Sequence, residues 1–126
     1  MNQLVNVSVP RVDGFNAELT LPSLLYLSGV LAQSEPGKLV GPFFEDLHRA
    51  VVADGLREII VDVRQLTFVN SSAIRLFVDW AARLRASSET EAYVIRFRTD
   101  RRITWQRTSF LVLQSLAPRQ IIIEAE

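Results

Sequence analysis

The sequence contains no cysteine and a single histidine, His48. The absence of cysteine excludes a disulfide framework, a thiolate zinc site and a cysteine nucleophile. With one histidine, no metal site can be built on several imidazoles, and serine–histidine catalysis would depend on that residue alone. Phosphate-binding glycine motifs and the nucleophile motif G-x-S-x-G are also missing. We therefore expect no catalytic residue, metal or cofactor, and a protein that is not an enzyme.

Long apolar runs and an excess of one charge are missing as well. No run reaches the roughly 18 apolar residues that span a bilayer, and the first residues, MNQLVNVSVP, lack the pattern of a secretory signal. These observations predict a cytoplasmic protein without a transmembrane segment. The 14 basic and 14 acidic side chains balance. This balance argues against nucleic-acid binding, because such binding depends on neutralising phosphates.

The balanced net charge hides an asymmetry along the chain. Residues 1–63 carry 4 basic and 8 acidic side chains, whereas residues 64–126 carry 10 basic and 6 acidic ones. Every basic residue except Lys38 is arginine. Arginine suits anion recognition because its planar donors match paired oxygens, although a GC-rich genome produces the same bias.

The pattern of apolar residues is typical of a globular protein. The 126 residues are 48% apolar and 22% charged, which fits a single domain over residues 1–126. Strands followed by alternating helices and strands predict an α/β domain with a mixed, largely parallel β-sheet packed with about three to four α-helices. A turn is expected at Ser34–Gly37. The expected strands are Leu4–Val9, residues 15–21, Leu24–Leu31, Arg57–Val63, Tyr93–Arg98 and Ile121–Ile123, and the expected helices are Val40–Ala53, residues 71–85 and Ile103–Gln114.

The segment from Glu58 to Phe77 carries the most information. The apolar residues Ile59–Val63 predict a buried strand, and after a short turn the residues Asn70, Ser71 and Ser72 open a helix. Asn70 or Ser71 can cap that helix by accepting from its free backbone N–H groups. A helix N-terminus also favours an anion, including a phosphate on a serine hydroxyl. The plain alternative is an ordinary cap, for which Asn and Ser are among the commonest residues.

This segment resembles the STAS domain of anti-sigma factor antagonists. The signature of that family is an apolar strand, an aspartate, a short spacer and then Asp-Ser-Ser/Thr-Gly at the start of a helix. Here the aspartate is Asp62, and Asn70 and Ala73 stand where the signature has Asp and Gly. The resemblance covers most of the chain, from Leu24 to Ile123. We expect a structural hydrogen-bonding role for Asp62.

The resemblance implies a bacterial partner-switching regulator of transcription that acts by protein–protein binding in signal transduction. In that family, a serine kinase that is also the anti-sigma factor phosphorylates the first serine of the signature, and a PP2C-type phosphatase removes the phosphate. Carried over, the phosphorylation site is Ser71, with Ser72 as the second candidate, and Asn70 and Ala73 belong to the partner site. The alternatives are a non-phosphorylated STAS scaffold or accessory subunit of a transporter complex, and a STAS module that senses a small anion or nucleotide.

The predicted strand Tyr93–Arg98 ends in an arginine, and two more arginines, Arg101 and Arg102, follow it. The carboxyl ends of parallel strands lie along one edge of a sheet, where open α/β folds bind ligands. We therefore hypothesise that Arg98, Arg101 and Arg102 lie near Ser71 and bind its phosphate or an acidic partner. A solvated arginine-rich loop is the alternative.

The predicted helix 71–85 has a wide apolar arc. Ala73, Leu76 and Trp80 extend its main apolar stripe sideways. We hypothesise that this flank, and above all Leu76 and Trp80, forms a partner-binding patch beside Ser71. The alternative is that another helix covers it. Trp105, near the start of the next predicted helix, has the same two interpretations.

Overall fold

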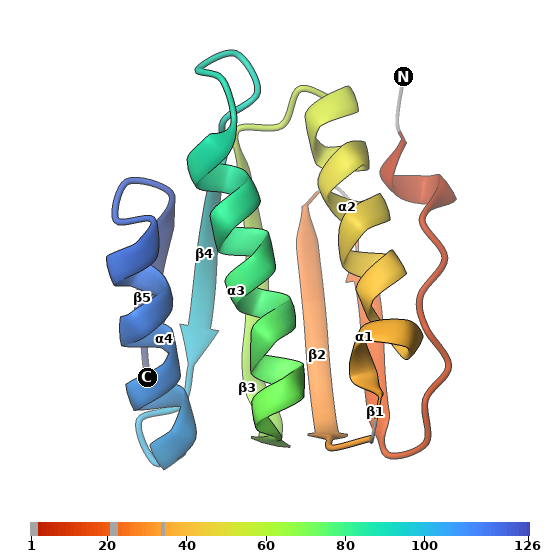
Figure 1. Ribbon diagram of the computed structural model, residues 1–126, viewed down its shortest axis with the longest axis vertical. Helices are drawn as coiled ribbons and strands as arrows, with labels where there is room; N and C mark the ends of the chain where they lie inside the picture. The colour runs from red at the N-terminus through yellow and green to blue at the C-terminus, as the bar shows by residue number, and fades with distance from the viewer. Residues whose placement is uncertain (1–2, 21–22, 34) are drawn as a thin grey trace.

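The computed structural model describes residues 3–20, 23–33 and 35–126, which form one five-stranded sheet beneath a layer of helices (Figure 1). A short 3-10 helix, η1 (Leu4–Asn6), precedes the first strand. The strands are β1 (Phe15–Thr20), β2 (Leu24–Leu31), β3 (Glu58–Val69), β4 (Val94–Thr99) and β5 (Ile121–Ala125). The α-helices of the described residues are α1 (Pro36–Leu39), α2 (Gly41–Ala53), α3 (Ser71–Ala86) and α4 (Thr104–Leu116).

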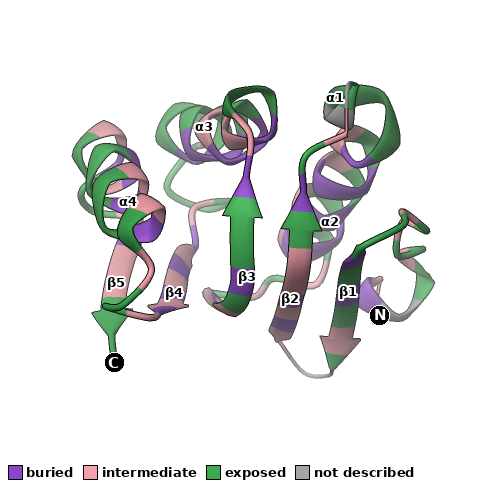
Figure 2. Ribbon diagram, turned by 90° about the horizontal axis from the view of Figure 1, so that it is seen from below, coloured by how far each residue is buried: buried purple, intermediate pink, exposed green. Residues whose placement is uncertain are grey.

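The strands lie in the sheet in the order in which they occur in the chain. β1 pairs with β2 in antiparallel orientation, and β2 to β5 pair in parallel. Right-handed crossovers that always advance in one direction place every helix on the same face of the sheet. Helices therefore cover one face, and no described element covers the other (Figure 2). The predicted fold class, a mixed and largely parallel sheet with three to four helices, is confirmed.

The core fills the space between the sheet and the helix layer. Along β4, buried residues alternate with half-buried ones, because successive side chains of a strand point to opposite faces. Phe77 of α3 lies at the centre of an aromatic cluster in this core. Its ring centroid is 5.5 Å from that of Phe44, 6.1 Å from that of Phe97 and 5.8 Å from that of Phe110. One side chain of α3 thus packs against α2, β4 and α4.

β3 is longer than the sequence indicated. The predicted strand ended at Val63 and a turn followed, but β3 continues to Val69 and remains paired with β2 up to Leu31. Arg64 and Gln65 interrupt the apolar run, and two register shifts in the β2–β3 ladder disturb the period of 2. Because one face of the sheet is uncovered, polar side chains are tolerated within the strand there.

The predicted strand Leu4–Val9 is wrong. Its first residues form η1, and the backbone N–H groups of Gln3 and Leu4 donate to the Asp54 carboxylate, the latter at 3.0 Å. Leu4 is buried in the core and Val7 packs against it, whereas Val9 is exposed, so the alternation of the segment does not come from a strand ladder. The other predicted strands and helices are present with boundary shifts. Ser34 of the predicted turn and residue 21 lie outside the described residues.

A close backbone approach fixes the corner where β1 begins. Gly14 and Gly29 have positive φ angles of 81° and 91°, a region that L side chains rarely adopt. Phe15 lies opposite Gly29 in the β1–β2 ladder, and the N–H of Val30 donates to the Gly14 carbonyl at 2.8 Å. A Cβ on Gly29 would stand 2.0 Å from that carbonyl oxygen, whereas a Cβ on Gly14 would meet nothing within 4 Å.

We predict that Gly29→Ala destabilises the fold far more than Gly14→Ala does. Both substitutions place alanine at positive φ, which costs about 1–2 kcal/mol. Gly29→Ala also drives a methyl group into a backbone carbonyl, so its total loss should reach about 3–5 kcal/mol. Urea unfolding of the two variants and the wild type measures these losses. Equal losses of stability in the two variants would show that the close contact between Gly29 and the Gly14 carbonyl has no steric role.

Three polar side chains meet between the helix layer and the sheet. The Trp80 indole donates to the Tyr93 hydroxyl at 2.7 Å, and that hydroxyl lies 2.8 Å from Nδ1 of His48. An indole N–H can only donate, so the hydroxyl accepts from Trp80. Which of the hydroxyl and Nδ1 of His48 donates to the other depends on the tautomer of the imidazole.

We predict that acidification weakens the fold through His48. Burial and the charge of Arg83 lower the pKa of His48 below its ordinary 6.5; Glu91 raises it and Arg49 lowers it further. The unfolded chain thus takes up this proton at a higher pH than the folded chain. The contribution of neutral His48 to the free energy of unfolding is complete above about pH 6.5, the pKa in the unfolded chain. It is lost as the pH falls through the lower pKa of the folded chain. Urea unfolding of wild type and His48→Gln measures the free energy of unfolding from about pH 7 down to 5. The difference between the two proteins should shrink as the pH falls, and a difference that does not change with pH would contradict this role.

Candidate functional site

The start of α3 lies where β3 ends, as the sequence predicted (Figure 1). Asn70 is the N-cap of α3, and its Oδ1 accepts from the backbone N–H of Ala73 at 2.8 Å. Its Nδ2 donates to the carbonyl of Gln33 at 3.0 Å, and its backbone N–H donates to the carbonyl of Leu31 at 3.0 Å. The predicted cap is confirmed. The bond to Gln33 uses an amide proton that aspartate lacks, so asparagine ties α3 to the segment after β2.

Ser71 and Ser72 form the first turn of α3, and both are exposed. Within the described residues, neither hydroxyl makes a hydrogen bond. The first turn contains no acidic residue, so no side chain offsets the positive end of the helix dipole there. A phosphate on either hydroxyl would be open to solvent and stabilised by that dipole.

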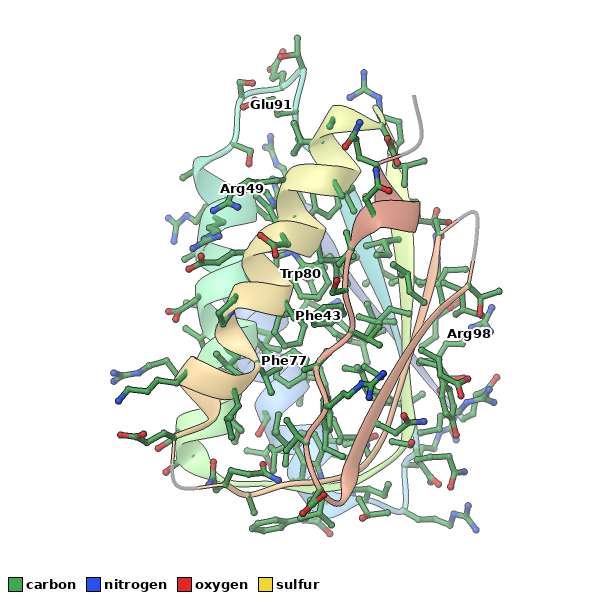
Figure 3. All side chains as sticks on the ribbon, turned by 90° about the vertical axis from the view of Figure 1, so that its right-hand side faces the viewer. Phe43, Arg49, Phe77, Trp80, Glu91 and Arg98 are labelled. Atoms are coloured by element: carbon green, nitrogen blue, oxygen red, sulfur yellow. The ribbon has the colours of Figure 1, made fainter. Side chains whose placement is uncertain are left out.

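The flank of α3 that was hypothesised as a partner patch is buried. Ala73, Leu76 and Trp80 are 0%, 7% and 2% exposed. The Trp80 ring lies 5.3 Å from the ring of Phe44 in α2, and Figure 3 shows Trp80 and Phe77 directed between the layers. Burial excludes these side chains from an exposed partner surface. The wide apolar arc has a simpler cause, since α3 packs against both the sheet and α2.

Arg98 lies on the uncovered face of the sheet. It stands opposite Asp62 in the β3–β4 ladder and points away from the helices (Figure 3). Ser71 opens a helix on the covered face. The hypothesised contact between Arg98 and a phosphate on Ser71 is therefore not formed in this structure, because the two side chains belong to opposite faces.

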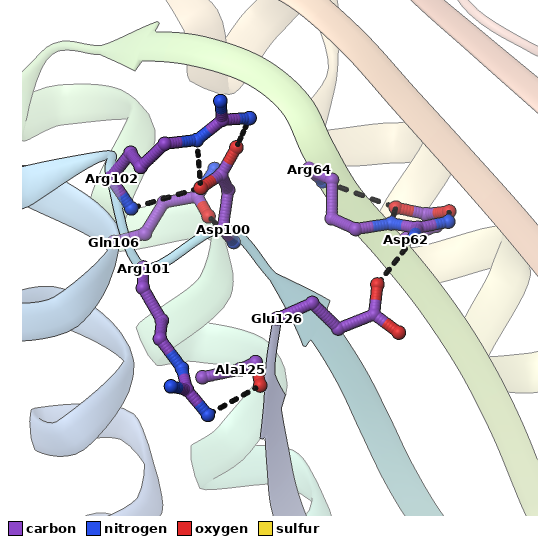
Figure 4. Close-up of polar contacts among 8 residues, drawn as sticks. All are labelled: Asp62, Arg64, Asp100, Arg101, Arg102, Gln106, Ala125 and Glu126. Atoms are coloured by element: carbon purple, nitrogen blue, oxygen red, sulfur yellow. Dashed lines mark hydrogen bonds and ion pairs between the residues drawn. The ribbon is translucent and has the colours of Figure 1, made fainter.

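Arg101 and Arg102 lie in the loop between β4 and α4 and bond to other partners (Figure 4). Nε and Nη2 of Arg102 donate to the Asp100 carboxylate at 3.1 and 2.9 Å. Arg101 donates to the carbonyl of Ala125 at 3.5 Å. In the described part of the chain, neither guanidinium contacts Ser71. The three arginines thus do not gather around the start of α3.

A polar cluster on the uncovered face centres on Arg64 (Figure 4). Its Nε and Nη2 donate to the Asp62 carboxylate at 3.0 and 2.7 Å, and its Nη1 pairs with Glu126. The expected structural hydrogen-bonding role of Asp62 is confirmed. Burial raises the pKa of Asp62, but the hydrogen bonds and charge of Arg64 and the charge of Arg98 outweigh it, so this pKa lies below its usual range.

An open cavity of about 630 Å³ lies beside this cluster. Its arginines and carboxylates are equal in number, and most of them are paired with each other. The cavity is therefore electrically balanced. Its lining residues are Tyr26, Asp62, Arg64, Gln65, Asp100, Arg101, Arg102 and Glu126.

Gln106 is a positioning residue that the sequence analysis missed. It is fully buried, and its Nε2 donates to the carbonyls of Val63 and Leu66 at 2.6 and 2.9 Å. Its Oε1 accepts from the backbone N–H of Asp100 at 2.9 Å. Gln106 thus fastens the β4–α4 loop to β3. A glutamine in the first turn of a helix normally faces solvent, so nothing in the sequence marked it.

Neither a known family model nor a curated protein matches the chain. Over the described residues, no helix has the length and hydropathy that a membrane crossing needs. The same residues contain no group of three or more acidic or histidine side chains placed to hold a metal ion.

We predict that Asn70→Ala destabilises the fold by about 1–2 kcal/mol, because it removes both the cap and the bond to Gln33. Asn70→Asp keeps the cap and loses the bond to Gln33, but it gains a favourable charge at the helix N-terminus. The stability that it loses should therefore be less than about half of the loss caused by Asn70→Ala. Ser72→Ala, exposed and without hydrogen bonds, serves as the control. Thermal unfolding orders the three variants, and a neutral Asn70→Ala would contradict the capping role.

Proposed function

We propose that this protein is a STAS-like bacterial regulator that acts by protein–protein binding in the cytoplasm and is controlled by reversible phosphorylation of Ser71. One observation carries the proposal. The exposed Ser71 hydroxyl opens a 16-residue helix directly after a long central strand, and an asparagine cap holds this junction in place. This arrangement supports what the resemblance implies, and Ser72 remains the second candidate.

The two departures from the family signature are compatible with this function. The side chain of Ala73 is fully buried, so its methyl group lies away from the surface that a kinase approaches. Asn70 keeps the capping bond of an aspartate and adds the bond to Gln33. Both residues support the start of α3, and neither covers Ser71.

Phosphorylation would change the surface at the start of α3. A phosphate adds roughly 1.5 to 2 negative charges at neutral pH, and these charges must lose water when a partner covers them. The unmodified form therefore binds its partner better than the phosphorylated form. The partners that the resemblance implies are a serine kinase that is also an anti-sigma factor, and a PP2C-type phosphatase.

A second candidate function is the sensing of a small anion or nucleotide in the cavity beside Arg64. Although the charges of the lining balance, the guanidinium of Arg101 has no carboxylate partner among the residues that the structure describes and makes a single long bond to a backbone carbonyl, and Tyr26 offers an aromatic ring. A ligand that binds only the folded state raises the melting temperature. Thermal unfolding with inorganic phosphate, ATP and GTP tests this candidate, and unchanged melting temperatures exclude these ligands. A scaffold without a phosphate cycle is the remaining alternative.

We predict that Ser71 carries phosphate in the native host. Phosphopeptide mass spectrometry on protein recovered with phosphatases inhibited should find the modified peptide in wild type and Ser72→Ala, and lose it in Ser71→Ala. The exposed Ser88→Ala variant, in the loop between α3 and β4, controls for handling. An unmodified Ser71 across growth and stress conditions would contradict the switch and favour a constitutive scaffold.

A further inference from the structure

The outer side of α4 exposes two large apolar side chains. Leu111 is 64% exposed and Val112 is 51% exposed, more than any other large hydrophobic side chain of the described residues. Their neighbours one turn away, Thr108 and Ser115, are exposed too. Residues three and four positions apart share a helix face, so these four side chains form one ridge, here called the α4 ridge. None of the helices and strands that the structure describes covers this ridge.

The chain segment that carries the α4 ridge has charge of one sign. From Arg101 to Ile123 the chain contains four arginines and no acidic residue. Arg107, beside the ridge, and Arg119, after the helix, make no hydrogen bond or ion pair with any described residue. Arg49 on α2, in contrast, is paired with carboxylates of its own helix, whereas Arg75 and Arg85 on α3 are exposed and, like Arg107, have no partner among the described residues. The α4 ridge thus combines apolar area with unpaired positive charge.

The α4 ridge and Ser71 belong to neighbouring helices whose first turns lie at one edge of the sheet. The Trp105 indole in the first turn of α4 donates to the carbonyl of Thr67 at 3.0 Å. Thr67 lies near the end of β3, four residues before Ser71. α3 also packs directly on α4 through the contact of Phe77 with Phe110. A protein whose active site reaches Ser71 can therefore extend along α4.

We infer that the α4 ridge is the docking surface for the kinase that modifies Ser71, and that this kinase presents an apolar ridge flanked by Asp or Glu side chains. The inference rests on the function proposed above. Burial of exposed apolar side chains such as Leu111 and Val112 contributes to the affinity of an interface, and the surrounding charges select the partner. An acidic partner matches the unpaired Arg107 and Arg119, and a basic partner would be repelled.

The test is the initial rate of Ser71 phosphorylation by an extract of the native host with ATP and phosphatase inhibitors. Leu111→Gln/Val112→Gln removes the apolar ridge, and Arg107→Glu reverses its charge while leaving the apolar residues in place. Ala82→Gln and Arg85→Glu make the same kinds of change at exposed positions of α3. We expect both α4 variants to lower the rate by about tenfold or more and both controls to retain it.

The outcomes separate the inference from the proposed function. If wild type is never phosphorylated on Ser71, the proposed function fails and the inference fails with it. If wild type is phosphorylated and the α4 variants keep its rate, or the controls fall equally, the docking surface alone is overturned. It is also overturned if wild type, but not the double variant, sediments with phosphatidylglycerol vesicles or forms dimers, because the ridge then serves a lipid or a second copy.

Discussion

All parallel connections of this protein advance the sheet in one direction, and this constraint determines most of the structure. The helices gather on one face, the core forms beneath them, and no described element covers the other face. Cross-strand ion pairs occupy that bare face, where Arg96 of β4 reaches both Glu58 of β3 and Glu124 of β5. The aliphatic parts of such long side chains shield apolar sheet surface while their charged ends stay in water.

The fold was largely predictable because its signals are local. The apolar run of β3 and the helical periods of α2 and α3 identify each element without knowledge of its neighbours. The predicted elements were wrong where contacts with distant parts of the chain determine the secondary structure. η1 depends on Asp54, which lies 50 residues after Leu4, and the second half of β3 depends on pairing with β2. Neither partner can be found from the pattern of the segment itself.

In the candidate site, too, features that depend on local sequence were predictable and features that depend on distant contacts were not. The cap at Asn70 was predictable because it involves a residue three positions away. The placement of Arg98 was not, because a period of 2 shows which residues share a face but not which face the helices cover. Trp80 was ambiguous for a related reason: an apolar arc has the same appearance whether a second helix of the chain or a partner covers it.

The agreement between strand order and chain order has a consequence for how the molecule meets others. The acidic first half of the sequence forms one side of the structure, and the arginine-rich second half forms the opposite side (Figure 1). A molecule with separated charge experiences a torque in the field of a charged partner and turns before contact. Encounters with an acidic surface therefore begin with α4 facing it. Dissolved salt would then control how often collisions are productive, and not only how long a complex lasts.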